Sequence, residues 1–525
     1  MENRHNLTKN LSKVSSGTFL SKITGLIRDI FLTHFLGATW VADSFAIAFV
    51  IPNMLRGLFG EGALAAAFIP SYTDINQNES KNEAIKFGLN ILTILIVILI
   101  LLVILGIILS PLIVSIIAPG LSVKATLLTE KLTRILFPYL FLIGLTSIII
   151  SILNVHTIFF IPSFSPAMMN LGIVSPVLLY SLFHDSTLAD KAYLFAGGVL
   201  FGGVLQLITN GFLLGKEGFK FNFHINLKHP EIKSVWKRMI PGIIGLGIRE
   251  VNVLVDTLLA SLLVAGSIAA LQYGNRLMQL PLGVFGIALG IAVLPLFSIH
   301  TSKHNIKALK SSLTDSVNMI LIIMLPILGL ILILGKDIIS LIFLHGVFDQ
   351  EALQMTYDAL AFYSLGLISH SCVKIFANAF FALKNTKKPM IISGIAVVCN
   401  IILNLILMRI LQLRGLALAS SLAATVQAFL LLLFLTKKIG KINFKLIITN
   451  FIKVTIISGF VVIISYSLNR SGLLFPGQSN WLLLLRLTAI LIVAFAIYIT
   501  GLKIFKVKEI DKLYFLIKKR VNHRE

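Results

Sequence analysis

The stretch "IAFVIPNMLRGLFGEGALAAAFIP", residues 47–70, is apolar enough to cross a membrane, yet Pro52, Asn53, Arg56 and Glu61 lie in its middle. An arginine at the centre of a membrane helix costs roughly 2.5–3.5 kcal/mol on insertion scales. A proline inside a helix leaves a backbone carbonyl unpaired and bends the helix. We therefore expect a broken helix that lines a cavity, in which the arginine meets an anionic partner.

The composition of the whole chain places this stretch in an integral membrane protein. Of its 525 residues, 57% are hydrophobic and 13% are charged, and the mean hydropathy is +0.94. Apolar runs of about twenty residues recur along the chain, which is the length that an α-helix needs to cross the hydrocarbon. The runs are continuous rather than alternating, which argues against a β-barrel. The sequence predicts an all-α polytopic membrane protein with about fourteen transmembrane helices.

The net charge of +23 does not indicate a nucleic-acid-binding protein. Lys and Arg lie in short loops between apolar runs and form no single patch, and every second connection holds most of them. Positive loops of this kind face the cytoplasm. The pattern predicts a multi-pass membrane protein with both termini on the cytoplasmic side.

An internal repeat divides the chain. The glycine-rich pattern of the opening stretch recurs later with one residue fewer, as Phe59-Gly60, Ala63-Leu64, Ala67 and Pro70 and again as Phe285-Gly286, Ala288-Leu289, Ala292 and Pro295. Two pseudo-symmetric lobes with a substrate cavity between them are a common plan for transporters. We predict lobes of about six helices each over 1–225 and 226–440, followed by a helix pair and a basic tail over 441–525.

Ionisable residues concentrate on the first two predicted helices of each lobe. Intramembrane charges usually face a bundle interior or a watery cavity. A cavity lined by Lys22, Arg28, Arg56 and Arg276 would be cationic and would suit an anionic substrate, phosphate in particular, because the planar guanidinium pairs with phosphate oxygens. The alternative is that charges such as Arg28 and Asp29 pair near helix ends and reach the interface.

A second polar set consists of oxygen donors in apolar surroundings. Asp256, Asn400, Asn404 and Ser420 carry the ligand type that a hard cation such as Na⁺ prefers. Hydrogen bonds between helices are the alternative explanation. Enzyme motifs are missing from the sequence: it has no His-Glu-x-x-His, Gly-x-Ser-x-Gly or P-loop pattern. We therefore expect a transporter rather than an enzyme, with no cofactor other than a candidate Na⁺.

Three segments resemble the MurJ (MviN) family of lipid II flippases, which belongs to the multidrug/oligosaccharidyl-lipid/polysaccharide exporter superfamily. They are "SSGTFLSKITGLIRDIFLTHFLGATWVADSFAIAFVIPNMLRGLFGEGALAAAFIP", "YGNRLMQLPLGVFGIALGIAVLP" and "FFALKNTKKP". They occur in order and at the family's spacing, and the likeness extends over essentially the whole chain.

The resemblance implies fourteen helices, two lobes around a central cavity and a final helix pair whose groove holds a polyprenyl tail. It implies that the chain moves undecaprenyl-diphosphate-linked peptidoglycan precursor, lipid II, from the inner to the outer leaflet by alternating access, for cell-wall synthesis and cell shape. The family's cavity arginines fall on Arg28, Arg56 and Arg276, and a further one falls on Lys22, which keeps the charge but loses the paired donors.

The resemblance also assigns supporting residues. Acidic family positions fall on Asp43 and Glu61, whereas Asn275 and Gln279 stand where some members have acids near Arg276. We add Asp29 and Asn53 as polar neighbours of the arginines. A sodium site of some relatives falls on residues of three predicted helices, with Asn404 in place of an acid: Asp256, Asn400, Asn404, the carbonyl of Leu416 and Ser420.

The expected partners are lipid II, membrane lipids and proteins of cell-wall synthesis and division, with no nucleic acid, and the expected state is a monomer. Two other functions stay open from the residues alone. One is a flippase for a different polyprenyl-linked saccharide, and the other is a membrane enzyme that acts on lipid diphosphates. A structural partner of cell-wall synthases without transport of its own is a third alternative.

Overall fold

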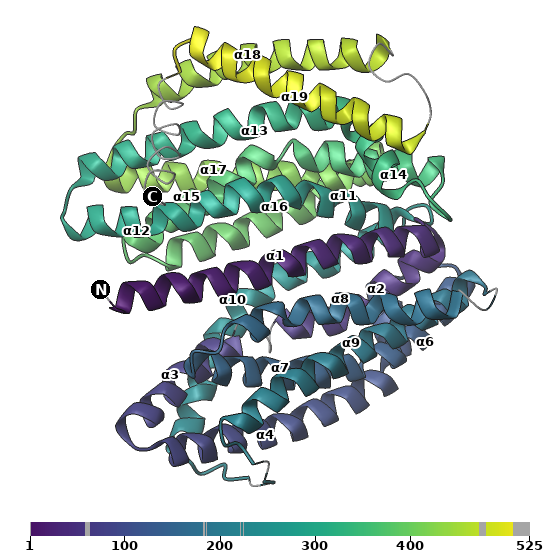
Figure 1. Ribbon diagram of the computed structural model, residues 1–525, viewed down its shortest axis with the longest axis vertical. Coiled ribbons are helices and arrows are strands. Elements are labelled where there is room, and N and C mark those ends of the chain that lie inside the picture. The colour runs from purple at the N-terminus through teal and green to yellow at the C-terminus, as the bar shows by residue number, and fades with distance from the viewer. Residues whose placement is uncertain are drawn as a thin grey trace. The chain divides into compact units, whose positions relative to one another are not determined.

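The computed structural model describes residues 2–57, 63–181, 184, 186–220, 222–223, 225–471 and 479–507, and this part of the chain contains helices and no strand (Figure 1). The predicted all-α class is confirmed. Two compact units are formed, Met1–Ala269 with His345–Asp349 and Ala270–Leu344 with Gln350–Glu525.

The first unit contains ten helices within the described residues. They are α1 Glu2–Leu36, α2 Trp40–Arg56, α3 Ala63–Asn78, α4 Lys81–Ile108, α5 Ser110–Ile117, α6 Val123–Leu136, α7 Pro138–Val155, α8 Phe160–Ser181, α9 Leu188–Lys216 and α10 Pro230–Ser261.

The chain enters the second unit through α11 Ser267–Pro281. The further elements are η2 Leu282–Ile287 (a π-helix), α12 Ala288–Ser302, α13 Ile306–Phe343, α14 Gln350–Ser364, α15 Leu367–Ala382, α16 Lys387–Leu411, α17 Leu413–Ile439, α18 Phe444–Ser471 and α19 Asn480–Ile504.

The predicted count of about fourteen membrane spans is not confirmed. Within the described residues, ten helical segments are long and apolar enough to cross a membrane, or eleven if the pair α14–α15, bent by 43°, is one span. Three predicted spans are not among these segments. One contains α1, one contains both α2 and α3, and one contains α10. Helices α2 and α3 are too short to cross a membrane separately, with 17 and 16 residues, and α1 and α10 carry several charges each.

The glycine-rich repeat contains irregular backbone in its second copy. In the first copy, α2 continues through Pro52 and ends at Arg56, and α3 begins at Ala63. In the second copy, the π-helix Leu282–Ile287 separates α11 from α12. The predicted break includes residues 58–62, which lie outside the described residues, and the described part shows that α2 continues through the proline. π-Helical turns are uncommon and are frequent at functional sites.

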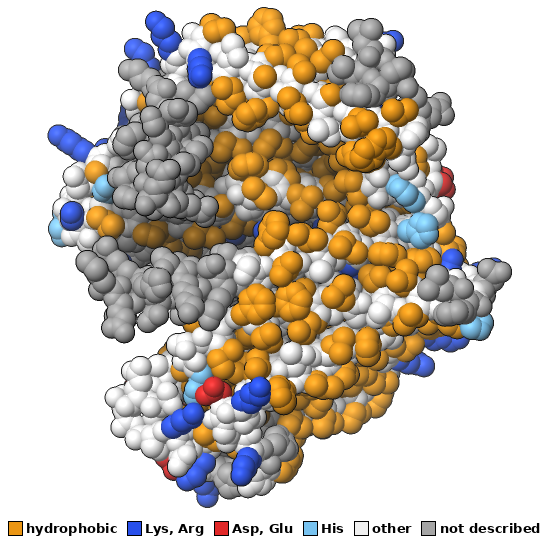
Figure 2. All heavy atoms as spheres, viewed as in Figure 1, with side chains coloured by type: hydrophobic (Ala, Val, Ile, Leu, Met, Phe, Trp, Pro, Cys, Tyr) orange, Lys and Arg blue, Asp and Glu red, His pale blue; other side chains and the backbone are white. Residues whose placement is uncertain are grey.

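Small residues allow close helix packing in the first unit. A β-carbon added to Gly172 of α8 would lie 2.4 Å from the Cα atom of Gly202 on α9. Two backbones that approach so closely gain van der Waals contact, which drives helix association in lipid. Away from this interface the helices are apolar outward: α4 exposes Leu101 by 56% and Ile108 by 66%, and Figure 2 shows hydrophobic side chains over much of the described surface.

The C-terminal helices α18 and α19 pack against each other and against α13 in the second unit (Figure 1). Their shared core includes Val454, Val461 and Tyr498, whose hydroxyl donates a hydrogen bond to the carbonyl of Ile322 on α13. This is the helix pair that the sequence places after the two lobes.

The compact units do not divide where the sequence repeat does. Helix α10 packs against α3 in the first unit, where Arg238 donates to the hydroxyl of Ser71 over 3.3 Å. The sequence analysis assigns α10 to the second lobe. The lobes 1–225 and 226–440 with the C-terminal part 441–525 stay a prediction, as does the central cavity between them.

Candidate functional site

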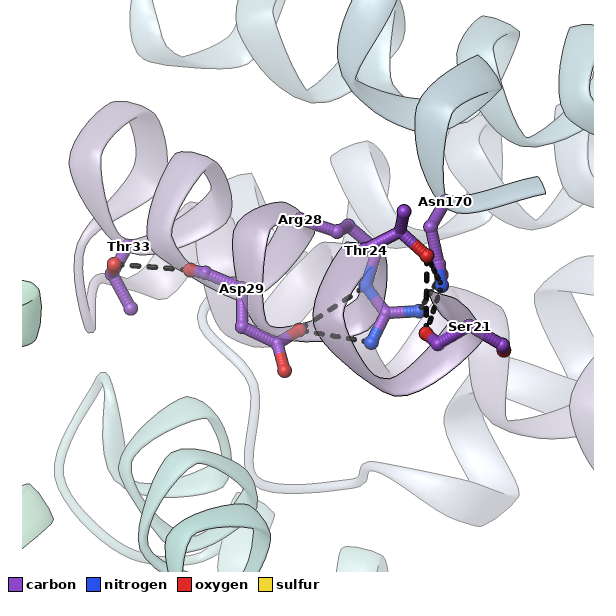
Figure 3. A network of polar contacts seen from close by, with 6 residues as sticks. All are labelled: Ser21, Thr24, Arg28, Asp29, Thr33 and Asn170. Carbon is purple, nitrogen blue, oxygen red and sulfur yellow. Dashed lines mark hydrogen bonds and ion pairs between the residues drawn. The ribbon is translucent and has the colours of Figure 1, made fainter. Parts of the chain in front are cut away.

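Arg28 on α1 is held by a set of polar groups inside the first unit (Figure 3). Its Nε and Nη2 donate to Oδ1 of Asp29 over 3.1 and 2.9 Å, and its Nη1 donates to Oδ1 of Asn170 on α8 over 2.8 Å. The amide of Asn170 donates to the carbonyl of Ser21 and to the hydroxyl of Thr24. Because a carbonyl only accepts, the Ser21 contact fixes which end of the amide faces the arginine.

This arrangement leaves part of the guanidinium available to a ligand. A guanidinium has five N–H donors, and three of them serve Asp29 and Asn170 among the described residues. The side chain of Arg28 keeps 16% of its surface exposed. It lies about 12 Å along α1 from the end of the helix at Leu36. The two remaining donors suit a phosphate oxygen.

Arg56 is the last residue of α2, where a cation interacts favourably with the helix dipole. Its Nε donates to Oδ1 of Asn53 over 3.0 Å. A β-carbon on the next residue, Gly57, would lie 3.4 Å from Oε1 of Glu250 on α10, so an acidic side chain lies beside the end of α2. Glu61, predicted as a supporting acid, lies outside the described residues.

Asp43 caps a helix. Its buried carboxylate accepts hydrogen bonds from the backbone N–H groups of Gly266 (2.5 Å) and Ala269 (2.8 Å), at the first turn of α11. The negative charge stabilises the positive end of that helix. These contacts give Asp43 a structural role, and its predicted part in supporting the substrate arginines stays a prediction.

The remaining predicted cations are exposed. Lys22 lies on the surface of α1 in the first unit, and Arg276 lies on the surface of α11 in the second unit. Next to Arg276, the amide of Gln279 donates to Oδ1 of Asn275 over 2.8 Å. That Lys22, Arg28, Arg56 and Arg276 line one cavity stays a prediction.

The predicted sodium ligands fall on both units. In the second unit, Asn404 donates to Oδ1 of Asn400 over 2.9 Å, Asn400 donates to the hydroxyl of Ser420 over 3.4 Å, and Ser420 donates to the carbonyl of Leu416 over 3.3 Å. Only the bond from Asn400 to Ser420 joins two helices, α16 and α17, as the alternative explanation requires; the other two lie within one helix. Asp256 belongs to the first unit, where it accepts from Asn252 over 3.0 Å.

Sequence reasoning missed two residues of the site. Asn170 binds Arg28 from 142 positions away, and an asparagine within an apolar run is the only signal that the sequence offers for it. Glu250 is a charged residue within an apolar run, but its place beside α2 follows from the packing of α10 on the first unit. In both cases a polar side chain from a distant part of the sequence lies beside a predicted cation, as is usual for charges within a membrane.

Comparison with known proteins agrees with the resemblance. The profile of the family described as "Lipid II flippase MurJ" matches residues 32–505. A "Probable lipid II flippase MurJ" of Buchnera aphidicola subsp. Schizaphis graminum is 33% identical over 443 residues, which cover 84% of this chain and 85% of the relative. Another, of Bdellovibrio bacteriovorus, is 30% identical over 501 residues and covers 95% of this chain and 94% of the relative.

Solved structures give the same result. The "Lipid II flippase MurJ, inward closed conformation" aligns with a TM-score of 0.79 at 27% identity and covers 95% of this chain and 99% of that one. An inward-facing multidrug resistance MATE family transporter of the MOP superfamily aligns with a TM-score of 0.68 at 14% identity and covers 82% of this chain and 98% of that one. The second likeness concerns the fold alone. The family profile and the two relatives show that this chain belongs to the MurJ family of lipid II flippases.

Proposed function

We propose that this protein moves lipid II from the inner to the outer leaflet of a bacterial cytoplasmic membrane by alternating access, for peptidoglycan synthesis. The observation that carries the proposal is the family match over 32–505, supported by the likeness to a MurJ structure over 95% of the chain. The protein is a transporter rather than an enzyme, and no bond of the cargo is made or broken.

The role of the arginines follows from the charge of the cargo. A diphosphate that crosses an apolar region needs fixed positive partners, because an isolated charge is costly there. Arg28 offers two N–H donors while Asp29 and Asn170 hold its plane in place. Arg56, Arg276 and Lys22 supply further charge. Preorganised donors of this kind bind phosphate oxygens without a further ordering cost.

The helix ends support the expected orientation. Connections rich in Lys and Arg, such as 384–388 and 437–445, lie on the side that we assign to the cytoplasm together with both termini. The lipid tail would lie along α18 and α19, while the head group meets the arginines. We also propose that the protein acts as a monomer, with cell-wall synthesis and division proteins as candidate partners.

Sodium is proposed as a coupling ion. Asp256 would supply the only negative charge, and the oxygens of Asn400, Asn404, Leu416 and Ser420 would supply neutral ligands of the type that a hard cation prefers. The expected result is that NaCl raises the melting temperature of the purified protein more than KCl does, and that Asp256→Asn removes the difference. Equal melting temperatures of the wild type in the two salts would contradict the site.

A cell assay tests the flippase function. Bacteria depleted of their own lipid II flippase would express this protein or its Arg56→Ala form, and an added hydrolase that cleaves only outer-leaflet lipid II would report the exposed fraction. We expect cleavage with the wild type and none with a well-inserted Arg56→Ala. If the inserted wild type gives no cleavage, the cargo is not lipid II and the proposal fails.

A further inference from the structure

An arginine on the C-terminal helix pair has no role in the proposed function. Arg486 lies on α19, about 9 Å along the helix from its start at Asn480. Its Nε atom is buried and has no hydrogen-bond partner among the described residues. A charged donor that is buried without a partner is costly, and an intramembrane arginine is by default part of a functional site.

The surroundings of Arg486 are apolar. The next residue, Leu487, is 4% exposed and belongs to a cluster with Leu334 of α13 and Ile490 of α19, against which Leu483 and Leu468 pack. Apolar neighbours lower the local dielectric constant, which strengthens an ionic interaction of the guanidinium. For the same reason, a guanidinium without an ionic partner is costly there. The apolar cluster therefore favours an ionic partner for Arg486.

Protein groups near this level do not supply that partner. Asp337 on α13 accepts a hydrogen bond of 2.6 Å from the amide of Asn469 on α18. No ion pair joins Asp337 or another acidic residue to Arg486 in the part of the chain that the structure describes. Since the described residues supply no anion for Arg486, the lipid that surrounds a membrane helix pair is the other source of one.

Aromatic residues indicate the depth of Arg486. Trp481 on α19 is 65% exposed and Tyr466 on α18 is 49% exposed, as in the aromatic belts that mark a membrane interface. Arg470 donates to the Tyr466 hydroxyl at the same level. Arg486 follows Trp481 by five residues, about 7.5 Å deeper. The opposite end of α19 carries Lys503 and lies on the side assigned to the cytoplasm.

We propose that Arg486 binds the phosphate of a lipid in the outer leaflet, at the α18–α19 pair. Arg486 as a whole is partly exposed although its Nε is buried, so binding requires the side chain to turn toward the lipid. In a guanidinium, Nε–H and one Nη–H point in the same direction, and after this rotation the two donors suit paired contact with two phosphate oxygens. The phosphate is that of a phospholipid or the diphosphate of the cargo, since both have this chemistry. The assignment of Arg486 to the outer leaflet rests on the orientation given under the proposed function. The α18–α19 pair would then bind a lipid head group at Arg486 and a lipid tail in its proposed groove.

Lipid retention measured by native mass spectrometry tests the subsite. The purified full-length protein would be mixed with phosphatidylglycerol, phosphatidylcholine or lipid II, as wild type, Arg486→Gln or Arg470→Gln. Arg470 is the matched control because it is exposed and lies near the same interface. We expect Arg486→Gln to retain about tenfold less of a bound lipid, whereas Arg470→Gln retains about as much as the wild type.

The lipid that is lost identifies the ligand. A loss of lipid II alone assigns the subsite to the cargo, and a loss of both phospholipids assigns it to membrane lipid. Retention by Arg486→Gln equal to the wild type for all three lipids overturns the proposal, and so does an equal loss in Arg470→Gln, which indicates general surface charge.

A second variant covers the case in which Arg486→Gln folds poorly. Arg486→Met keeps the length of the side chain in an apolar form, so it should fold. Added lipid should raise the melting temperature of the wild type and leave that of Arg486→Met unchanged; equal shifts refute the subsite. These readouts do not need flipping, so a wild type that binds lipid through Arg486 but moves no lipid II refutes the proposed function alone.

Discussion

Asn170 offers the sharpest test of the site in the first unit. Replacing it with alanine removes its hydrogen bond to Arg28 at 2.8 Å and its bonds to Ser21 and Thr24 at 3.2 and 3.1 Å. Hydrogen bonds to charged groups contribute about 1.5–3 kcal/mol in water-soluble proteins, whereas bonds between membrane helices average about 0.6 and reach about 1.7 kcal/mol. Because Asn170 is 6% exposed and its partner is charged, we expect an Asn170–Arg28 coupling of about 1.5 kcal/mol.

A double-mutant cycle isolates this coupling. The free energy of unfolding would be measured in detergent for the wild type, Asn170→Ala, Arg28→Met and the double variant. Thr33→Val is the matched control on α1, because the Thr33 hydroxyl donates only to backbone carbonyls of its own helix. Independent sites are additive within about 0.5 kcal/mol. A coupling within that scatter would refute the view that Asn170 holds the guanidinium in place.

Three further predictions concern the first unit. Asp43→Ala should lower the free energy of unfolding by about 2 kcal/mol or more, since two backbone donors at the start of α11 lose their buried acceptor; Asp43→Asn, which keeps one acceptor oxygen, should lose less in the same titration. Burial lowers the pKa of His156, in the α7–α8 connection, below its usual 6.5, so the folded state binds fewer protons than the unfolded state. Stability should therefore fall as the pH drops from 6.5 toward the folded pKa, and His156→Gln should flatten this dependence in melting curves. Gly172→Leu should prevent correct packing of α8 on Gly202 and reduce the yield of monodisperse protein, whereas Gly197→Leu, which has open space, should not.

The fold class and the arginines could be read from the sequence for local reasons. Hydropathy over about twenty residues reports whether a segment lies in lipid, and Arg28 or Arg56 stands out against such a background. The same rule applies to Arg486, but an arginine near one end of an apolar run is ordinarily explained by a side chain that reaches the membrane interface.

The contacts of these residues could not be read in this way, because they depend on tertiary packing. Asn170 meets Arg28 only because α8 packs on α1, and Asp43 meets α11 across 223 positions of the chain. The sequence predicts that Pro52 contributes to a break of the helix, but α2 continues through the proline to Arg56. A proline removes one backbone hydrogen bond, which neighbouring groups in a membrane protein can offset.

Reconstitution tests the central claim most directly. The purified wild type would be placed in vesicles that carry lipid II in both leaflets, and a lipid II hydrolase would be added outside. The account predicts that cleavage rises from about half of the lipid II toward completion with the wild type and stays at about half with Arg28→Gln or with empty vesicles, because the spontaneous crossing of a diphosphate is slow. Cleavage that stops at about half with a well-folded wild type, or that completes equally with Arg28→Gln, would contradict transport of lipid II through this arginine.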